Sequence, residues 1–199
     1  MQRNDLTRRA FVAALTASVA SVAAPASALE PATAQGLVDR VLADVVPLIN
    51  SGQTAEQMFP AFERIFATYA DVPAIARAAL GPVARTLPAA EFAAYEGAFR
   101  LYMARKYGRR FREFIGGRIE VTGAAPLGRH AEVRSMVEMT GWAPFEMLWH
   151  VADVGGQPLF FNLIIEGVNM LAVERTEIQA MLAARGGDVG RLVQDLAQA

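Results

Sequence analysis

The feature that most constrains this chain is a change of hydrophobic period at residues 116–117, which are both glycine. Upstream, apolar side chains recur at helical spacing, for example at Phe92, Tyr95 and Phe99, and such spacing predicts an amphipathic helix. Downstream, apolar and polar residues alternate, which is typical of strands with one buried face. The sequence therefore predicts a helical part followed by a sheet.

The alternation occurs in four runs that are separated by turns rich in glycine and proline. The runs cover residues 118–122, 132–139, 145–151 and 159–166. Such a succession predicts an antiparallel meander with one apolar face. That face has to be covered by the helices that precede and follow it. The expected fold class is α+β, with a four-stranded curved antiparallel sheet covered by N-terminal and C-terminal helices.

Helical spacing or helix-end signals mark the segments on both sides of the sheet. The expected helices cover residues 32–49, 55–69, 72–80, 88–114, 170–184 and 189–196. Asp71 is placed to cap the short third helix and Gly81 to end it. We expect a single domain over residues 29–199, made of a helical half (29–116) and a sheet with a helical tail (117–199).

The first 28 residues have the layout of a secretory signal peptide. Basic residues, including the pair Arg8-Arg9, precede an apolar run over residues 10–24, and Ala26-Ser27-Ala28 supplies a small-residue cleavage site. The apolar run is too short to span a bilayer. We therefore expect residues 1–28 to direct export. The arginine pair resembles a twin-arginine signal, although an ordinary Sec signal can also contain two arginines.

The composition argues against most catalytic chemistry. The chain has no cysteine, which excludes disulfides and thiolate sites. Its two histidines, His130 and His150, are far apart, and no His/carboxylate group has metal-ligand spacing. A Gly-x-Ser-x-Gly turn and phosphate-binding glycine loops are missing. Beyond residue 28 the chain holds 16 basic and 19 acidic residues, which makes nucleic acid a poor partner. We expect a binding protein without cofactor or metal.

One stretch of this acidic chain is basic. Residues 100–118 contain seven lysines and arginines and a single glutamate. This charge predicts either a basic mouth or docking surface for phosphate groups or an acidic partner, or a solvated helix face whose arginines pair with acids elsewhere. The sequence leaves both interpretations open.

Several stretches resemble, in the same order, the MlaC or toluene-tolerance family of periplasmic lipid carriers. Residues 71–81 (DVPAIARAALG) are similar to the short-helix signature of that family, and residues 99–116 to the long helix that follows. Residues 164–169 (IIEGVN) are similar to its closing strand, and the glycine pair at 186–187 to the turn before its last helix. The resemblance covers nearly all of residues 29–199.

The resemblance implies a periplasmic carrier that is not an enzyme. Such a carrier holds the two acyl chains of a phospholipid in an apolar cavity between the sheet and the helices. Its partners are an inner-membrane ABC lipid transporter complex and an outer-membrane lipoprotein complex, and the system maintains the lipid asymmetry of the outer membrane. The chain would be an auxiliary component of that transport system.

The apolar residues of the inner sheet face and of the facing helices are the predicted lipid contacts. They are Phe66, Ile75, Leu80, Phe92, Phe99, Tyr102, Met103, Val121, Val137, Met139, Phe145, Met147, Trp149, Val151, Phe161, Leu163 and Ile165. The basic residues predicted to meet a head group or a partner are Arg105, Lys106, Arg109, Arg110 and Arg112.

Three alternatives remain at the level of the sequence. The cargo can be a hopanoid, a sterol-like molecule or an aromatic compound in place of a phospholipid. A curved sheet with a helical cover also occurs in small isomerases and hydrolases, for which Asp153, His150 and Glu166 are the candidate acids and bases. A filled interior would instead indicate a structural adaptor in an envelope complex.

Overall fold

The computed structural model describes residues 28–198, without the side chains of Phe111 and Arg112. The predicted signal peptide therefore lies outside the described residues except for Ala28. In chain order the elements are α1 (Pro31–Ile49), α2 (Ala55–Tyr69), α3 (Val72–Leu80), η1 (Gly81–Arg85), α4 (Ala89–Arg110), η2 (Phe111–Phe114), β1 (Arg118–Leu127), β2 (His130–Glu138), β3 (Phe145–Val154), β4 (Gln157–Ile165), β5 (Val168–Asn169), α5 (Met170–Ala183) and α6 (Val189–Gln198).

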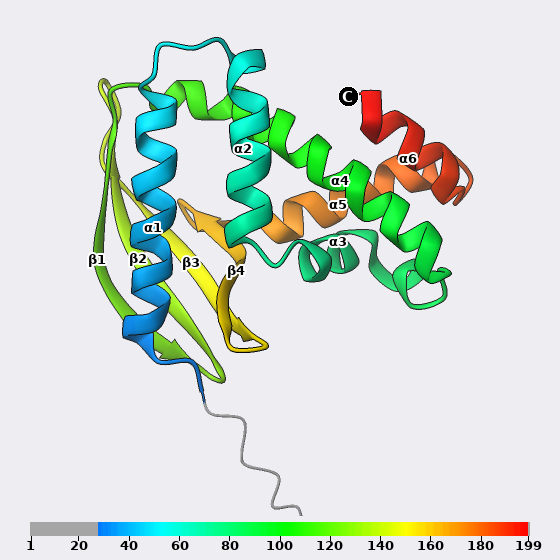
Figure 1. Cartoon of the computed structure of the whole chain (residues 1–199), viewed down its shortest axis with the longest axis horizontal. Coiled ribbons are helices and arrows are strands. Elements are labelled where there is room, and N and C mark those ends of the chain that lie inside the picture. The colour runs from blue at the N-terminus through cyan, green and yellow to red at the C-terminus, as the bar shows by residue number, and fades with distance from the viewer. Residues whose placement is uncertain (1–27, 199) are drawn as a thin grey trace, which may run out of the picture.

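The strands form one antiparallel sheet in the order β1-β2-β3-β4-β5. The predicted α+β class and the meander are confirmed. A fifth strand joins the four expected ones, because the chain turns at residues 166–167 and pairs Val168 with Ile165. Its two residues are too few to show alternation in the sequence. The register shifts at β-bulges in β1 and in the β3–β4 pair, and bulges bend strands, in agreement with the curved sheet of Figure 1.

Side-chain caps explain where the second and third helices begin. Thr54 and Gln57 form a reciprocal capping box at the start of α2, which satisfies two backbone N–H groups that have no partner inside the helix. The Asp71 carboxylate accepts a hydrogen bond from the backbone N–H of Ala74 and caps α3 as predicted. Gly81 ends α3 with a φ of 74°, a conformation that glycine adopts without strain.

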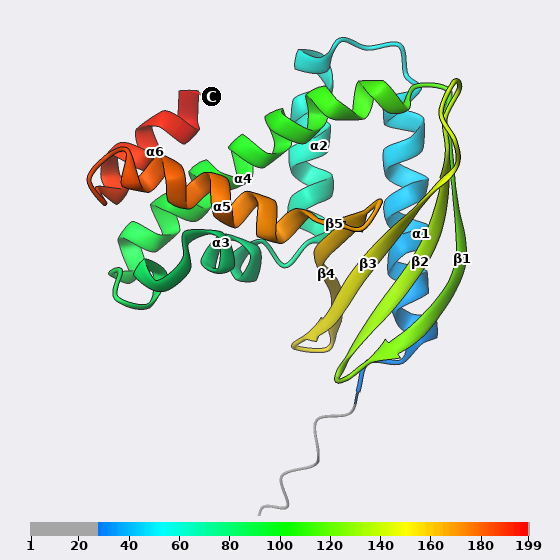
Figure 2. The same ribbon diagram turned by 180° about the vertical axis from the view of Figure 1, so that it is seen from behind.

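The helices divide between two places on the sheet. Helix α1 lies along the inner face against β1 and β2, as Figures 1 and 2 show from opposite sides. Helix α2 packs on α4, α4 packs on α6, and α3 packs on α5. These three contacts place most of the helical layer beside β4 rather than over the middle of the sheet. Among the described residues, no helix is both long and apolar enough to cross a bilayer.

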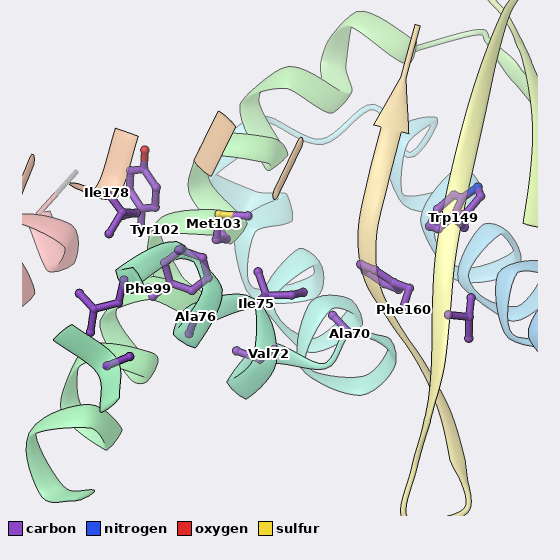
Figure 3. Close-up of a cluster of buried hydrophobic side chains, with 14 of the residues drawn as sticks. Ala70, Val72, Ile75, Ala76, Phe99, Tyr102, Met103, Trp149, Phe160 and Ile178 are labelled. Carbon is purple, nitrogen blue, oxygen red and sulfur yellow. The ribbon is translucent and has the colours of Figure 1, made fainter. Parts of the chain in front are cut away.

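Helix α4 carries apolar side chains on two adjoining faces. Tyr95 and Phe99 are fully buried and in ring contact with each other. In Figure 3, Phe99 and Tyr102 lie beside Ile178 of α5, on the helical side of the interior. Met103 is the next residue along the helix, and a step of one residue turns the side chain by about 100°. It therefore belongs to the second face.

A buried polar cluster joins α4 to α5. Lys106 donates hydrogen bonds to Glu174 at 2.7 Å and to Glu177. The Tyr107 hydroxyl donates to the same Glu174 oxygen at 2.6 Å, and the Glu174 side chain is 1% exposed. A buried carboxylate is stable only when charges and hydrogen bonds compensate its desolvation. The cluster therefore fixes the first turns of α5 relative to α4.

The pKa values of the cluster follow from this geometry. Burial lowers the pKa of Lys106, but the hydrogen bonds to Glu174 and Glu177 and the charge of Glu174 outweigh it and hold that pKa above its ordinary value. Burial raises the pKa of Tyr107, and the charge and hydrogen bond of Glu174 raise it further. A lysine whose pKa is raised by folding stabilises the fold at pH values below the ordinary lysine pKa. This contribution is lost as the pH rises through the pKa of the folded state. At neutral pH the ammonium and the phenol both remain donors.

Two glycines are expected to respond to alanine with opposite signs. At Gly81 the backbone has a positive φ, and a Cβ would overlap the side-chain amide of Gln179, so Gly81→Ala should destabilise by about 1–3 kcal/mol. At Gly97 in α4 a Cβ meets nothing within 4 Å, so Gly97→Ala should stabilise by about 0.5–1 kcal/mol. Urea unfolding of both variants checks this. Effects of the same sign would contradict the backbone conformation of Gly81 or the open space beside Gly97.

The polar cluster should behave as a coupled unit. Lys106→Met leaves the Glu174 carboxylate buried without its cation, and Glu174→Leu leaves Lys106 with Glu177 alone, so each should cost about 2–4 kcal/mol. The double variant should cost less than either single change, because it removes both charges together. Arg118→Met is the control, since its ion pairs are exposed and should contribute less than about 1 kcal/mol. Additive free energies in this double-mutant cycle would show that the residues are not coupled.

Candidate functional site

A cavity of about 490 Å³ lies between the inner face of the sheet and the helices. Side chains of α1 to α5 form one wall, and side chains of β1, β3 and β4 form the other. Most of the lining is aliphatic, aromatic or methionine. The volume is within the range of roughly 300–1,000 Å³ that is typical of sites for small molecules. Hollow space of this size is absent from an ordinary protein core, which is close-packed.

Aromatic rings line the inner end of the cavity. Trp149 and Phe160 meet edge to face with ring centroids 5.7 Å apart, and Phe66 approaches Phe160 at 6.3 Å. Ile75 of α3 lies between these rings and the helical core in Figure 3. Ile75, Trp149 and Phe160 are each at least nine-tenths buried. The end of the cavity is therefore an apolar surface.

The polar atoms behind this surface have partners within the protein. The Trp149 indole N–H donates to the Ser135 hydroxyl at 2.9 Å, and that hydroxyl donates to the Met147 carbonyl at 3.2 Å. The Asn162 amide oxygen accepts from the backbone N–H of Leu171 at 3.1 Å and ties β4 to the start of α5. Polar groups that are satisfied in this way impose no requirement for a polar ligand.

One side of the wall is polar and belongs to the cluster described above. Tyr107 and Glu174 both line the cavity, but the Tyr107 hydroxyl and one carboxylate oxygen of Glu174 are bonded to each other. Lys106 lies behind them and does not line the cavity. The cluster thus supports the wall between α4 and α5.

The cavity opens at the end of the sheet where β3 begins and β4 ends. We define its mouth by the lining residues that are exposed to solvent: Arg110, Glu113, Trp142, Glu166 and Val168. They come from the end of α4, from η2, from the β2–β3 loop and from the turn into β5. Because η2 directly follows α4, the mouth is built from three segments that are distant in the sequence.

Many of the predicted lipid contacts lie on the cavity wall. They are Phe66, Ile75, Met103, Met139, Phe145, Met147, Trp149, Phe161, Leu163 and Ile165. The alternation of β3 and β4 accounts for the placement of Met147, Leu163 and Ile165, and the second face of α4 accounts for that of Met103. That these residues contact a lipid stays a prediction.

The other predicted contacts lie in packed core away from the cavity, which corrects their assignment. Four of them pack in the helical core: Leu80, Phe92, Phe99 and Tyr102. The last three lie on the first face of α4, and Leu80 of α3 lies on the same side of the interior. Val121, Val137 and Val151 also lie outside the lining. The first two belong to β1 and β2, where α1 occupies the inner face of the sheet.

The predicted basic surface is dispersed. Of its members, only Arg110 lines the cavity among the side chains that the structure describes. Arg105 donates to the Ala197 carbonyl at 2.8 Å, and Lys106 belongs to the buried cluster. Arg109 is exposed, with its guanidinium 6.0 Å from the Phe59 ring. The Arg112 side chain lies outside the described residues. The described side chains of α4 therefore do not form a basic mouth.

Several wall residues were not predicted from the sequence. They are Val41, Leu42, Val45, Phe62, Ile65, Ala104, Tyr107, Phe114, Ile119, Phe160, Met170, Leu171 and Val173. Those of α1 and α2 follow helical spacing, which marks a buried face without showing what it faces. Trp142 and Val168 carry a different signal, since they are large apolar residues in a loop and in a two-residue strand and are 64% and 50% exposed.

The candidate acids and bases of the enzyme alternative do not come together. His150 lies with Glu132 at 3.3 Å and with Asn162 at 3.4 Å, in the polar row of the sheet that alternates with the inner face. Asp153 is exposed near the β3–β4 turn, where its carboxylate accepts from the backbone N–H of Gly156. Glu166 is exposed at the mouth. No metal-binding group of His, Asp and Glu exists within the described residues.

Comparison with solved structures places this fold beside a lipid-binding protein. The phospholipid-binding protein from Ralstonia solanacearum, solved in complex with a phospholipid, matches with a TM-score of 0.70 and 19% sequence identity. The match covers 83% of this chain and 95% of that chain. At this identity the likeness establishes a shared fold. Among curated proteins, no sequence matches.

A family model agrees with the resemblance seen in the sequence. The model described as MlaC protein matches residues 36–198. The match runs from α1 through α6 and includes the residues that form the cavity and its mouth. On this evidence, the chain belongs to the MlaC family.

Proposed function

We propose that this chain is a periplasmic carrier that holds a two-chain phospholipid by its acyl chains in the cavity. It moves the lipid between an inner-membrane ABC lipid transporter complex and an outer-membrane lipoprotein complex. The cavity is the single observation that carries this proposal. Family membership and the phospholipid in the Ralstonia relative support it.

The size and the apolar lining of the cavity favour an occupant. Cavities in protein cores cost roughly 24 cal/mol per Å³, so a dry hollow of this volume would cost on the order of 10 kcal/mol if it stayed empty. That is comparable with the whole folding free energy of a typical domain, about 5–15 kcal/mol. Water is a poor filling for the aromatic inner end, since ordered water needs polar partners. An apolar ligand relieves the cost.

The energetics of such a ligand suit transport. Each methylene that leaves water gains about 0.8 kcal/mol, so two acyl chains gain on the order of 20 kcal/mol and do not escape into water. A bilayer offers the same chains nearly the same gain. Transfer between a membrane complex and the carrier can then be close to neutral in free energy, and the direction of movement is set by the partners rather than by the affinity of the carrier.

The head group remains at the mouth in this proposal, because a phosphate buried without partners is strongly destabilised. The export-type N-terminal sequence supports a periplasmic location. The family supports the two membrane complexes as partners and a role in outer-membrane lipid asymmetry.

Native protein should therefore be isolated with lipid. Extraction with organic solvent, followed by mass spectrometry, is expected to yield about one two-chain phospholipid per protein. A hopanoid or an aromatic compound in its place would correct the cargo and keep the carrier. An empty protein, isolated without detergent from its own host, would contradict the carrier itself.

Filling the cavity should exclude the lipid without unfolding the protein. Leu163→Trp adds a large apolar side chain on the wall and should lower bound lipid at least about fivefold, with unfolding of the lipid-free protein unchanged or shifted to higher temperature. Ile164→Trp is the matched control, because adjacent strand residues point to opposite faces and Ile164 does not line the cavity. Equal lipid content in the two variants would show that the cavity is not the binding site.

A further inference from the structure

The mouth of the cavity carries a mixture of charges. Arg110 provides one cation, and Glu113 and Glu166 provide two anions, all on exposed side chains that line the same opening. Among the described side chains that define it, the mouth therefore has a net charge of −1, although Arg110 and Glu113 belong to the most basic part of the sequence. An anionic ligand group alone would meet more repulsion than attraction there.

The charges of the mouth are not neutralised within the described part of the chain. Among residues 28–198, leaving aside the undescribed side chains of Phe111 and Arg112, neither Arg110 nor Glu113 nor Glu166 forms an ion pair. Other charges near this end are paired: Arg118 lies 3.0 Å from Glu120 and 3.6 Å from Glu138. One cation and two anions are thus left facing the opening.

Trp142 adds an aromatic surface to the same opening. Its side chain is 64% exposed and lines the cavity. An exposed tryptophan contributes little to folding, because it gains little from burial. The face of an indole ring attracts ammonium groups, and aromatic side chains recognise them in many proteins. Carboxylates beside an indole are a combination suited to an alkylammonium cation.

The backbone conformation of Glu166 also indicates a functional role for this residue. Its φ is 50°, in the left-handed region, and in the described residues it is the single non-glycine residue with a positive φ. Two-residue hairpin turns of this type favour asparagine or aspartate at that position, and a longer side chain is strained there. Residues held in such conformations occur preferentially at functional sites. The strained position puts a carboxylate at the mouth.

We propose that the mouth selects zwitterionic phospholipids, with the phosphate beside Arg110 and the ammonium of the head group beside Glu113, Glu166 and Trp142. This inference rests on the proposed function, because it requires the acyl chains to be in the cavity. It assigns the substrate class as phospholipids with an ammonium group, in preference to anionic phospholipids such as phosphatidylglycerol. Both classes have the same acyl chains, so the preference arises at the mouth alone.

The test supplies both lipid classes at once. Lipid-free protein is loaded from detergent micelles that contain equimolar phosphatidylethanolamine and phosphatidylglycerol with identical acyl chains. The re-isolated protein is then extracted, and both lipids are quantified per protein. We expect phosphatidylethanolamine to exceed phosphatidylglycerol about threefold in low salt, the effect of one or two exposed charge contacts. In 0.5 M salt the ratio should approach one, because exposed charges are screened.

Substitutions separate the parts of the site. Glu113→Gln with Glu166→Gln should bring the ratio close to one at unchanged total lipid, and Trp142→Ala should lower the ratio independently. Arg110→Gln should lower the retention of both lipids, because both carry a phosphate. Glu91→Gln is the control, an exposed carboxylate in the first turn of α4 that does not line the cavity, and it should keep the threefold ratio.

The total bound lipid tests the carrier function, and the ratio of the two lipids tests the head-group selection. Full loading at a ratio of one in the wild type, or a ratio that survives in the double glutamine variant, overturns the head-group selection and leaves the carrier function in place. Absence of both lipids from the wild type overturns the carrier function and the selection together.

Discussion

The interior of this protein depends on how much of the sheet a single helix can cover. Helix α1 occupies the inner face over β1 and β2, so that Val133 and Val137 are fully buried. The apolar residues of β3 and β4, such as Met147 and Leu163, need another cover. The remaining helices pack mainly on one another. The uncovered part of the sheet face therefore borders a cavity instead of a close-packed core.

This arrangement requires helix α4 to serve two interfaces at once. One face carries Phe99 into the helical core, and the adjoining face carries Met103 to the cavity wall. The Lys106–Glu174 ion pair lies where the two faces meet, and it holds α5 in place without filling the cavity. An apolar contact in its place would have to bring the helices closer, because dispersion forces act only at short range. Long polar side chains can span helices that stand apart.

Much of the fold could be predicted from local signals, because periodicity and caps act over a few residues. The change of period at residues 116–117 located the sheet, and Asp71 located α3. The two-residue strand β5 was missed because Val168 and Asn169 have no local pattern of their own. For the site, alternation placed residues such as Met147 correctly on the wall. It could not separate Val137 from Met147, since both point to the inner face and only the position of α1 distinguishes them.

The sequence by itself determined the order of helices and strands, the apolar face of each strand and the absence of thiol side chains, since these depend on residue type and spacing. The tertiary structure decided which apolar residues border empty space and which charges meet at the mouth. Arg110 and Glu166 are more than fifty residues apart in the chain and meet only because α4 and β4 end at the same side of the cavity. The hydrophobic effect is non-directional and depends only on the apolar area that leaves water. It therefore cannot specify whether an apolar face packs against another side chain or against a ligand.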